Sequence, residues 1–354
     1  MDAAQPLPAV PDGERYCRRV LPGVSRTFAL SVRLLPGTLG RAVLVAYLIC
    51  RIADTVEDDV ALGGAEKRRL LDLLLDCFET PDAATRFAAA CASVSGDPAH
   101  VDLARHAAHV FVVYHALPPG TRAPVRRWAS EMVEGMAKFA VRYPRGVRIQ
   151  TLAEYREYCY YVAGTVGRML TDLWHEHAPS IGERRYAELR SRAVSFGEAL
   201  QTVNILKDIA EDARGENAVY VPEQLLRENG GSHLLLLEGG VLPRDDRALE
   251  RLTQLARDGL TDAVMYVKGI PRRAVAIRLF CILPLLFAYA TLRELEHAAR
   301  LPGGRGGRLV KISRREVRSI LAACTVLIFS NDALAWLVDR IRLRPFRVAY
   351  GTSR

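Results

Sequence analysis

The sequence has few cysteines, and none of them is placed for a disulfide framework. Seven cysteines are scattered along 354 residues, their number is odd, and no two form a Cys-x-x-Cys pair. In a chain of this size and composition, that usage argues against a disulfide-stapled secreted domain. It predicts that the cysteines are small core residues of a protein in a reducing compartment.

The sequence also lacks a secretory signal and a long apolar run. Residues 1–11 contain an acid and three prolines rather than an apolar core. The most apolar run, Leu279 to Ala290, holds 12 residues and includes Pro284. A membrane-spanning helix needs about 20 apolar residues, so we predict no transmembrane anchor and a cytoplasmic location.

No nucleic-acid motif accompanies the positive charge of the chain. The net charge is +9 and the sequence pI is about 9.3, yet the arginines are spread along the whole chain with no basic cluster interleaved with aromatics. We therefore predict no nucleic-acid partner. A solvated basic surface, a membrane surface and a phosphorylated substrate remain open as explanations of the charge.

Alternating strand patterns are nearly absent, whereas helical periodicity recurs along the chain. No repeat or long linker divides it, so we predict one all-α domain of about ten helices over residues 14–345. Residues 1–13 are expected to be a flexible leader and residues 346–354 a tail. Ser25 is a candidate N-cap. The expected helices are Thr38 to Asp54, Ala65 to Glu79, 83–94, 98–116, 121–141, 151–177, 183–212, 245–267, 272–300 and 314–341.

The first informative stretch follows the apolar run from Arg41 to Cys50. At 3.6 residues per turn, one helix face carries Tyr47, Arg51, Asp54 and Asp58. Carboxylates gathered after an apolar segment are costly unless they are paired or bound to metal. The pattern therefore indicates a divalent cation. The alternative is an ordinary charged helix end with ion pairs along the helix.

A second stripe lies between Phe196 and Asp212. Four polar residues recur at spacings of 3, 4 and 4 on one face, with Glu211 beside them: Gln201, Asn204, Asp208 and Asp212. The rest of this helix is largely apolar, which predicts a buried helix with its polar stripe at a cavity wall. Oxygen donors without His or Cys favour Mg²⁺, which commonly binds one or two carboxylates together with phosphates. Arg26 and Arg51 are candidates to hold those phosphate oxygens.

A third stretch, Tyr158 to Gly167, places two glycines inside a helical pattern. Glycine costs about 1 kcal/mol relative to alanine in a helix, so the pair indicates a steric requirement. Tyr158 is a candidate to donate a proton or to stabilise a carbocation through its ring. The alternative is a core tyrosine whose hydroxyl is satisfied by a neighbour.

Together, four stretches resemble the motifs of the squalene/phytoene synthase family, in that family's order. They are Ser25 to Phe28, Arg51 to Asp59, Tyr158 to Gly167 and Gln201 to Asp212, and the similarity covers about residues 15–345. The resemblance implies the all-α isoprenoid synthase fold with a central cavity. Asp54 to Asp59 and the basic segment Val310 to Arg314 are most similar to the squalene-forming branch, of the bacterial type that has no carboxy-terminal membrane helix.

The resemblance also implies a reaction and its cofactors. Two farnesyl diphosphates would join head-to-head through presqualene diphosphate, and NADPH would reduce this intermediate to squalene. Mg²⁺ would be required, with Mn²⁺ as an alternative ion. A monomer is expected, and the loss of the membrane helix suggests peripheral contact with a membrane surface.

Site residues carry over from the family position by position. The implied metal ligands are Asp54, Glu57, Asp58, Asn204, Asp208, Glu211 and Asp212. The implied catalytic set is Tyr47, Tyr158, Asp54, Asp58, Asp208 and Asp212. Substrate contacts would come from Arg26, Phe28, Arg51, Val162, Gln201 and Asn204. NADPH contacts would come from Arg26, Arg51, Lys207, Lys311 and Arg314.

Three departures from the family pattern bear on the reduction step. Lys207 stands where an arginine is frequent, and Ser313 where a basic residue is expected. The loop 213–222, similar to the active-site flap, is one residue longer and has Ala218 where an arginine is common. A synthase that stops at dehydrosqualene, hydroxysqualene or phytoene therefore remains open, as does a non-catalytic relative.

Overall fold

The computed structural model describes residues 7–25, 28–240, 247–300 and 310–346, and these residues form helices and connecting loops without a strand. The all-α prediction is thus confirmed. The bounds are α1 Val10–Val24, α2 Phe28–Val32, α3 Gly37–Asp58, α4 Gly64–Asp76, α5 Ala83–Ala90, η1 Cys91–Ser93, α6 Pro98–Arg105, α7 Ala107–His115, α8 Pro119–Arg142, α9 Leu152–Cys159, the π-helical η2 Tyr160–Gly164, α10 Thr165–His177, α11 Glu183–Gly215, α12 Glu223–Arg227, α13 His233–Leu237, α14 Arg247–Gly269, α15 Val275–Arg300, α16 Arg314–Leu327 and α17 Asn331–Leu343.

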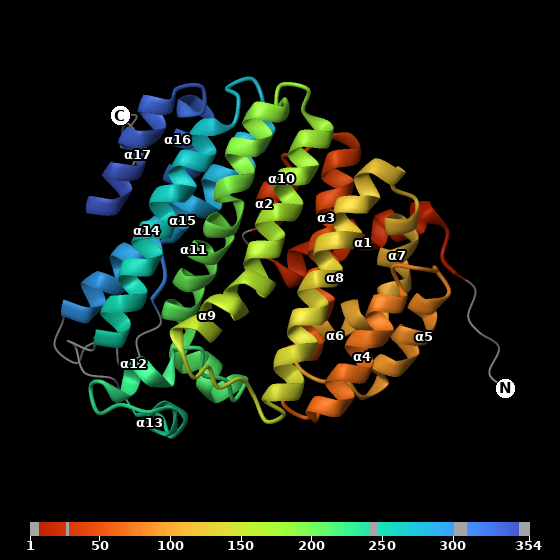
Figure 1. Cartoon of the computed structure of the whole chain (residues 1–354). Helices are drawn as coiled ribbons and strands as arrows, with labels where there is room; N and C mark the ends of the chain where they lie inside the picture. Colours follow the sequence, from red (N-terminus) through yellow and green to blue (C-terminus); the bar gives the residue numbers. More distant parts are fainter. Residues whose placement is uncertain (1–6, 26–27, 241–246, 301–309, 347–354) are drawn as a thin grey trace, which may run out of the picture.

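The helices form two halves that meet along the middle of the molecule (Figure 1). One half contains α1 and α3 to α8, with α3 packed against α7 and α8. The other contains α10, α11 and α14 to α17, with α11 packed along α14. Helix α10 contacts both α3 and α11, so it joins the halves. The two acidic stretches predicted from the sequence, on α3 and on α11, thus lie in different halves.

The amino-terminal prediction is wrong in part. Helix α1 begins at Val10, inside the expected leader of residues 1–13. Pro11 is compatible with a first helical turn because its missing N–H has no partner there in any helix. Gly13 then lets α1 approach α7 closely, since a Cβ at this position would lie 2.6 Å from the carbonyl oxygen of His109. Part of the segment whose composition resembles a flexible leader therefore forms the start of a packed helix.

Several expected helices have different bounds or are interrupted. The first long helix continues past Asp54 to Asp58, which keeps the acidic motif helical. The expected helix 98–116 breaks at His106, and the expected helix 314–341 breaks at Ser330. In the second case the Ser330 hydroxyl accepts a hydrogen bond from the N–H of Ala333 and so begins α17. Because such caps compete with the continuation of a helix, a single stretch of helical apolar spacing in the sequence forms two separate helices.

Helix α15 is apolar and long enough to meet the composition criterion for a membrane span, over Val275–Ala299, but 72% of its most apolar window is buried inside the fold. It packs against α11, α14, α16 and α17. Its Arg278 is fully buried, and the guanidinium donates to the carbonyl of Ile328 and to the Asn331 side chain. These contacts are those of a core helix. All seven cysteines are buried and unpaired, as predicted.

Candidate active site

The carboxy-terminal half of α3 presents one polar face. Between Ala42 and Asp59, the half-exposed positions are Tyr47, Arg51, Asp54 and Asp58, and the others are buried. This is the face that the helical spacing predicts. Arg51 pairs with Asp54 at 3.3 Å and donates to the Tyr47 hydroxyl at 3.4 Å. The Arg51 Nε atom is buried and has no partner, which leaves it free to donate to a ligand.

Two further polar residues fix the end of α3 from behind. Lys67 on α4 is 6% exposed, and its ammonium donates to the backbone carbonyl of Glu57. A cation at a helix carboxy terminus is favourable because the last carbonyls carry partial negative charge. Asp59 accepts hydrogen bonds from the N–H and hydroxyl of Ser95 at 2.7 and 2.9 Å. The last acid of the motif therefore anchors a loop, and the acids before it face the site.

The acids on α3 repel one another in the absence of an ion. Burial raises the pKa of Glu57 to about 8, and the charges of Asp54 and Glu216 act in the same direction. Burial also raises the pKa of Asp54, although Arg51 opposes this, and raises that of Asp58. Glu57 Oε1 is buried without a hydrogen-bond partner. A buried carboxylate oxygen without a donor is the arrangement that a bound cation would satisfy.

The α11 stripe is less enclosed than the sequence predicts. Asn204 and Glu211 are exposed, and Gln201, Asp208 and Asp212 are half-buried. Lys207 pairs with Asp208 at 2.6 Å, so its ammonium is committed to an acid of the stripe. Burial raises the pKa of Asp212 to about 8, with Glu216 and Asp208 adding to the shift. The stripe is therefore partly exposed to solvent, and its position at a cavity wall stays a prediction.

Glu216, which the sequence analysis missed, connects the two acidic sets electrostatically. It caps the carboxy terminus of α11. Its charge raises the pKa of Glu57 and Asp58 on α3 and that of Asp212 on α11. Two motifs in different halves of the fold therefore face a shared site. The signal was available, because Glu216 continues the four-residue spacing of Asp208 and Asp212.

Two stacked tyrosines lie beside these acids. The ring of Tyr158, 4% exposed, stacks on that of Tyr220 with centroids 4.9 Å apart. Burial raises the pKa of both phenols, and the charges of Glu57 and Asp58 add to it. Both are therefore neutral proton donors near the α3 acids. Tyr220, on the loop after α11, was not predicted.

The two predicted glycines have the steric purpose expected of them. A Cβ on Gly167 would lie 2.0 Å from the carbonyl of Ala193, so this residue brings α10 against α11. Gly164 ends the π-helical turn that contains Val162. Because a π turn inserts an extra residue into a helix, it changes which side chains face the site relative to a regular helix.

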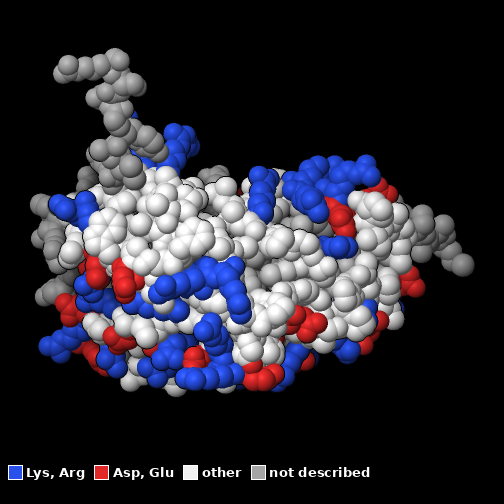
Figure 2. Space-filling model, turned by 90° about the horizontal axis from the view of Figure 1, so that it is seen from above, with Lys and Arg blue, Asp and Glu red and all other residues white. Residues whose placement is uncertain are grey.

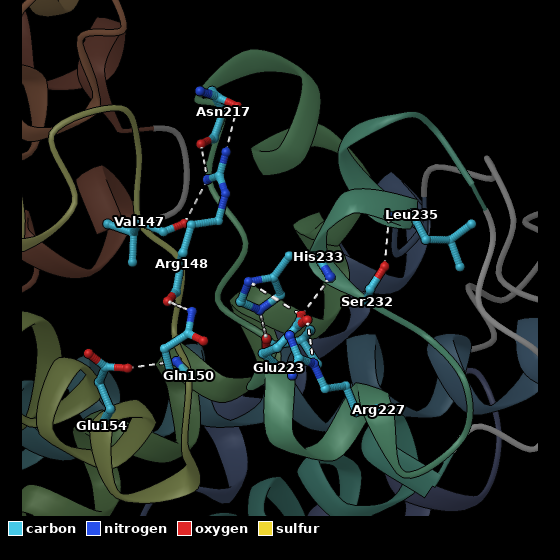
Figure 3. Close-up of polar contacts among 11 residues, drawn as sticks. Val147, Arg148, Gln150, Glu154, Asn217, Glu223, Arg227, Ser232, His233 and Leu235 are labelled. Atoms are coloured by element: carbon cyan, nitrogen blue, oxygen red, sulfur yellow. Dashed lines mark hydrogen bonds and ion pairs between the residues drawn. The ribbon is translucent and has the colours of Figure 1, made fainter.

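The loop after α11 is tied to the segment before α9 (Figure 3). Arg148 donates through both terminal nitrogens to Asn217, to its backbone carbonyl and, at 2.7 Å, to its side-chain oxygen. Asn217 has φ +49°, a left-handed conformation that asparagine tolerates. Backbone bonds of 2.9 Å from Val219 to Val147 and of 3.2 Å from Ile149 to Val219 continue the pairing. This clasp holds the loop that carries Glu216 and Tyr220.

The structure does not place every predicted residue at the site. Arg26 lies outside the described residues. Phe28 begins α2 and stacks on Tyr47 with centroids 5.7 Å apart, next to the α3 face. The Ser25 hydroxyl accepts from the N–H of Phe28, as its predicted capping role requires. Lys311 and Arg314 are exposed at the start of α16, which packs against α15 and α17.

The structure accounts for Ser313, where the family resemblance led us to expect a basic residue. Its hydroxyl accepts from the N–H of Glu316 at 3.1 Å and caps α16. Within the described residues, no hydrogen bond or ion pair joins this segment to the polar faces of α3 or α11. That Lys311 and Arg314 contact NADPH together with Arg51 and Lys207 therefore stays a prediction.

The donor set fits Mg²⁺ by its chemistry but does not form a closed cage. Among the described residues, no three His, Cys, Asp or Glu side chains converge closely enough to hold a metal by themselves. Mg²⁺ usually keeps several waters and takes one or two carboxylates together with substrate phosphates. Separate carboxylates on α3 and α11, with an unpartnered oxygen on Glu57, suit that mode.

Comparison with known proteins points to one family. The squalene/phytoene synthase family model matches residues 21–316. Squalene synthase of Schizosaccharomyces pombe is 31% identical over 80% of this chain and 60% of its own length. Squalene synthase 1 of Arabidopsis thaliana is 28% identical over 78% of this chain and 64% of its own length. The chain therefore spans less than two thirds of these relatives.

Solved structures show the same fold. TcSQS in complex with the ligand E5700 superposes with a TM-score of 0.75 at 24% identity, covering 94% of this chain and 98% of that one. Squalene synthase HpnC of Alicyclobacillus acidocaldarius gives a TM-score of 0.56 at 21% identity, with coverages of 83% and 96%. With a family model that matches most of its length, this chain belongs to the squalene/phytoene synthase family.

Proposed function

We propose that this protein is a squalene synthase that condenses two farnesyl diphosphates and reduces the product with NADPH. The observation that carries the proposal is the site between α3 and α11, where Glu216 connects two acidic sets and Arg51 has a free buried donor. An acid-rich site with a guanidinium is suited to a diphosphate held through divalent cations. The relatives of about 30% identity named above are squalene synthases.

The site residues would have different roles according to their positions. Asp54, Glu57 and Asp58 would hold Mg²⁺ on one side, with Asn204, Asp208, Glu211 and Asp212 on the other. When bound, Mg²⁺ neutralises charge on a departing diphosphate. Arg51 Nε would donate to a diphosphate oxygen. Tyr158 and Tyr220 present neutral hydroxyls and ring faces, which can stabilise a nearby cation and exclude water from it.

A synthase that stops before reduction is the second candidate. A solved dehydrosqualene synthase shares the fold with a TM-score of 0.53 at 20% identity. The specific observation in its favour is at the proposed NADPH segment, where Ser313 caps a helix and Lys311 is exposed. A non-catalytic relative is disfavoured by the intact acids of both motifs.

The product decides among these activities. Purified protein is incubated with farnesyl diphosphate and Mg²⁺, with and without NADPH, and the extracted hydrocarbons are identified by mass spectrometry. Squalene that forms only with NADPH supports the first candidate. Dehydrosqualene or hydroxysqualene that forms irrespective of NADPH supports the second, and geranylgeranyl diphosphate replaces farnesyl diphosphate in a parallel assay for phytoene.

A further inference from the structure

Glu223 and His233 form a polar pair that is buried beside the loop after α11 (Figure 3). Over the face of the molecule seen from above, Lys and Arg side chains gather in several groups in contact with solvent (Figure 2). By contrast, Glu223 and His233 are only 8% and 7% exposed. Burying a carboxylate and an imidazole is costly unless their polar atoms are hydrogen-bonded. The contacts of this pair therefore indicate what it holds in place.

The turn after α12 brings the two residues together. Glu223 begins α12, and Gly230, with φ +74°, lies in the left-handed region that glycine adopts without strain. The backbone N–H of His233 then donates to Glu223 Oε2 at 2.6 Å, and Arg227 Nε donates to Glu223 Oε1 at 2.9 Å. Burial opposes the ionisation of Glu223, but these two donors hold its pKa below the ordinary value. Glu223 is therefore a carboxylate at neutral pH.

The imidazole of His233 is directed at the backbone of the loop. Its Nε2 atom lies 2.8 Å from the carbonyl oxygen of Val221. A carbonyl oxygen only accepts, so Nε2 carries the hydrogen in this contact. Val221 is fully buried, and an unpaired carbonyl at this position would be costly. His233 therefore fixes the backbone immediately after Tyr220.

The backbone before Tyr220 is fixed as well. The N–H of Val219 donates to the carbonyl of Val147 at 2.9 Å. Tyr220 thus lies between two anchored residues, with its ring stacked on Tyr158 and its hydroxyl 3.5 Å from Glu216 Oε2. The direction of a side chain depends on the backbone that carries it. A shift of the backbone on either side would therefore move the Tyr220 ring away from these partners.

We propose that His233 is a positioning residue for Tyr220. Its imidazole fixes the Val221 carbonyl and so keeps the ring and the hydroxyl of Tyr220 at the acidic site. The clasp of Arg148 and Asn217 holds the start of the loop at the surface, whereas His233 holds its end in the interior. This inference rests on the proposed function, in which Tyr220 acts near the reacting cation, and it adds a residue from outside the acidic site.

Three variants separate positioning from general stability. His233→Leu removes the donor to Val221 and keeps an apolar side chain of similar size. His233→Gln places an amide N–H near the position of Nε2 and should restore the hydrogen bond. Ser232→Ala is the matched control, because it removes the acceptor for the N–H of Leu235 at the start of α13 and leaves the contact with Val221 in place.

The expected effects are local to the loop and to turnover. In His233→Leu, amide hydrogen exchange at residues 219–221 should accelerate by about tenfold or more, because the loop opens more easily without this hydrogen bond. With farnesyl diphosphate and Mg²⁺, kcat should fall by about tenfold, since a misplacement of about 1 Å can cost up to ~100-fold. KM should change by less than about twofold, because the proposed diphosphate contacts are untouched. His233→Gln should recover most of both losses, and Ser232→Ala should resemble the wild type.

Unchanged exchange at residues 219–221 in His233→Leu, or unchanged kcat despite faster exchange, would overturn the proposal. Equal losses in Ser232→Ala would also overturn it, because the effect would then come from α13 as a whole. Circular dichroism confirms folding, and if His233→Leu does not fold, His233→Asn replaces it with the same expected losses, since its side chain is too short to reach Val221. Failure of the proposed function would show differently, as absence of any prenyl product from the wild-type protein. That result would remove the role in turnover, while the exchange data would still decide whether His233 holds the loop.

Discussion

The two acidic regions of the site are built differently. The α3 region is supported from behind by buried Lys67 and by Asp59, and its Arg51 already pairs with Asp54. The α11 region lies at a helix end with Asn204 and Glu211 exposed, and it depends on the clasp between Arg148 and Asn217 for the loop that follows. The α3 region is fixed by the core, whereas the loop that follows the α11 region is held by a surface contact.

This difference indicates which side can adapt to ligands. Side chains anchored in a core are costly to move, whereas loops with few buried contacts open at low free energy. We infer that the α3 acids keep their positions while the loop after α11 adjusts around a bound diphosphate. The following predictions test both the shared function of the two regions and their different rigidity.

The largest effect is expected from removal of one acid on either side. Asp54→Asn and Asp208→Asn should each lower turnover with farnesyl diphosphate by at least about a hundredfold, because metal-assisted charge stabilisation contributes several kcal/mol. Product formation is measured at saturating Mg²⁺, with circular dichroism as the folding control. Full activity in both variants would refute the metal assignment for both regions.

The next effect is on stability as a function of pH. The pKa values of Glu57 and Asp212 are raised to about 8, whereas unfolded carboxyls titrate near pH 4. The folded chain thus binds these protons more tightly, so their stabilising contribution is complete below about pH 4 and is lost as the pH rises through about 8. Without metal, the melting temperature should fall between pH 5 and 8 by about 5 °C.

The double variant Glu57→Gln with Asp212→Asn is the reference for this measurement, because it keeps all other titrating groups. Its melting temperature should vary less with pH than that of the wild type. Mg²⁺ with inorganic diphosphate should also flatten the wild-type profile, since cations replace the bound protons. Parallel profiles for wild type and variant would contradict the assignment of the slope to these two carboxyls.

Lys67 tests the rigid side. Lys67→Met keeps the length of the side chain but removes the donor to the Glu57 carbonyl, and we expect a loss of about 1–3 kcal/mol in the free energy of unfolding. The apparent Mg²⁺ affinity should fall as well, because the end of α3 loses its support. Lys67→Arg should recover part of both. The measurements are urea denaturation and Mg²⁺ activation curves. An unchanged Mg²⁺ dependence would show that Lys67 contributes to stability but not to metal binding.

Arg148 and Asn217 test the adaptable side, where the smallest effect is expected. Arg148→Ala should cost about 1 kcal/mol of stability, as for an exposed hydrogen-bonded group. Asn217→Gly retains the left-handed backbone and should cost less than Asn217→Ala. Hydrogen exchange at residues 216–221 should accelerate in Arg148→Ala and stay slow in residues 48–56 of α3. Equal acceleration in both segments would remove the proposed difference in rigidity.

Much of the site could be predicted because local geometry determines it. The spacing of Tyr47, Arg51, Asp54 and Asp58 fixes their common face on any regular helix, and this face is the one left half-exposed in α3. The steric need at Gly167 was visible for the same reason. Tyr220 and Arg148 could not be predicted in this way, since they reach the site through a loop and through pairing between distant segments.

The sequence by itself determined an all-α chain with two acidic faces, because helix periodicity and residue chemistry are local properties. Only the tertiary structure decided that the charge of Glu216 raises the pKa of acids on both faces, and that Asp59 anchors a loop. It also decided that part of the expected leader is a packed helix, and that Phe329 in the turn after α16 and Trp336 of α17 are exposed. These outcomes depend on which surfaces meet, and contacts between residues far apart in the sequence leave no periodic signal.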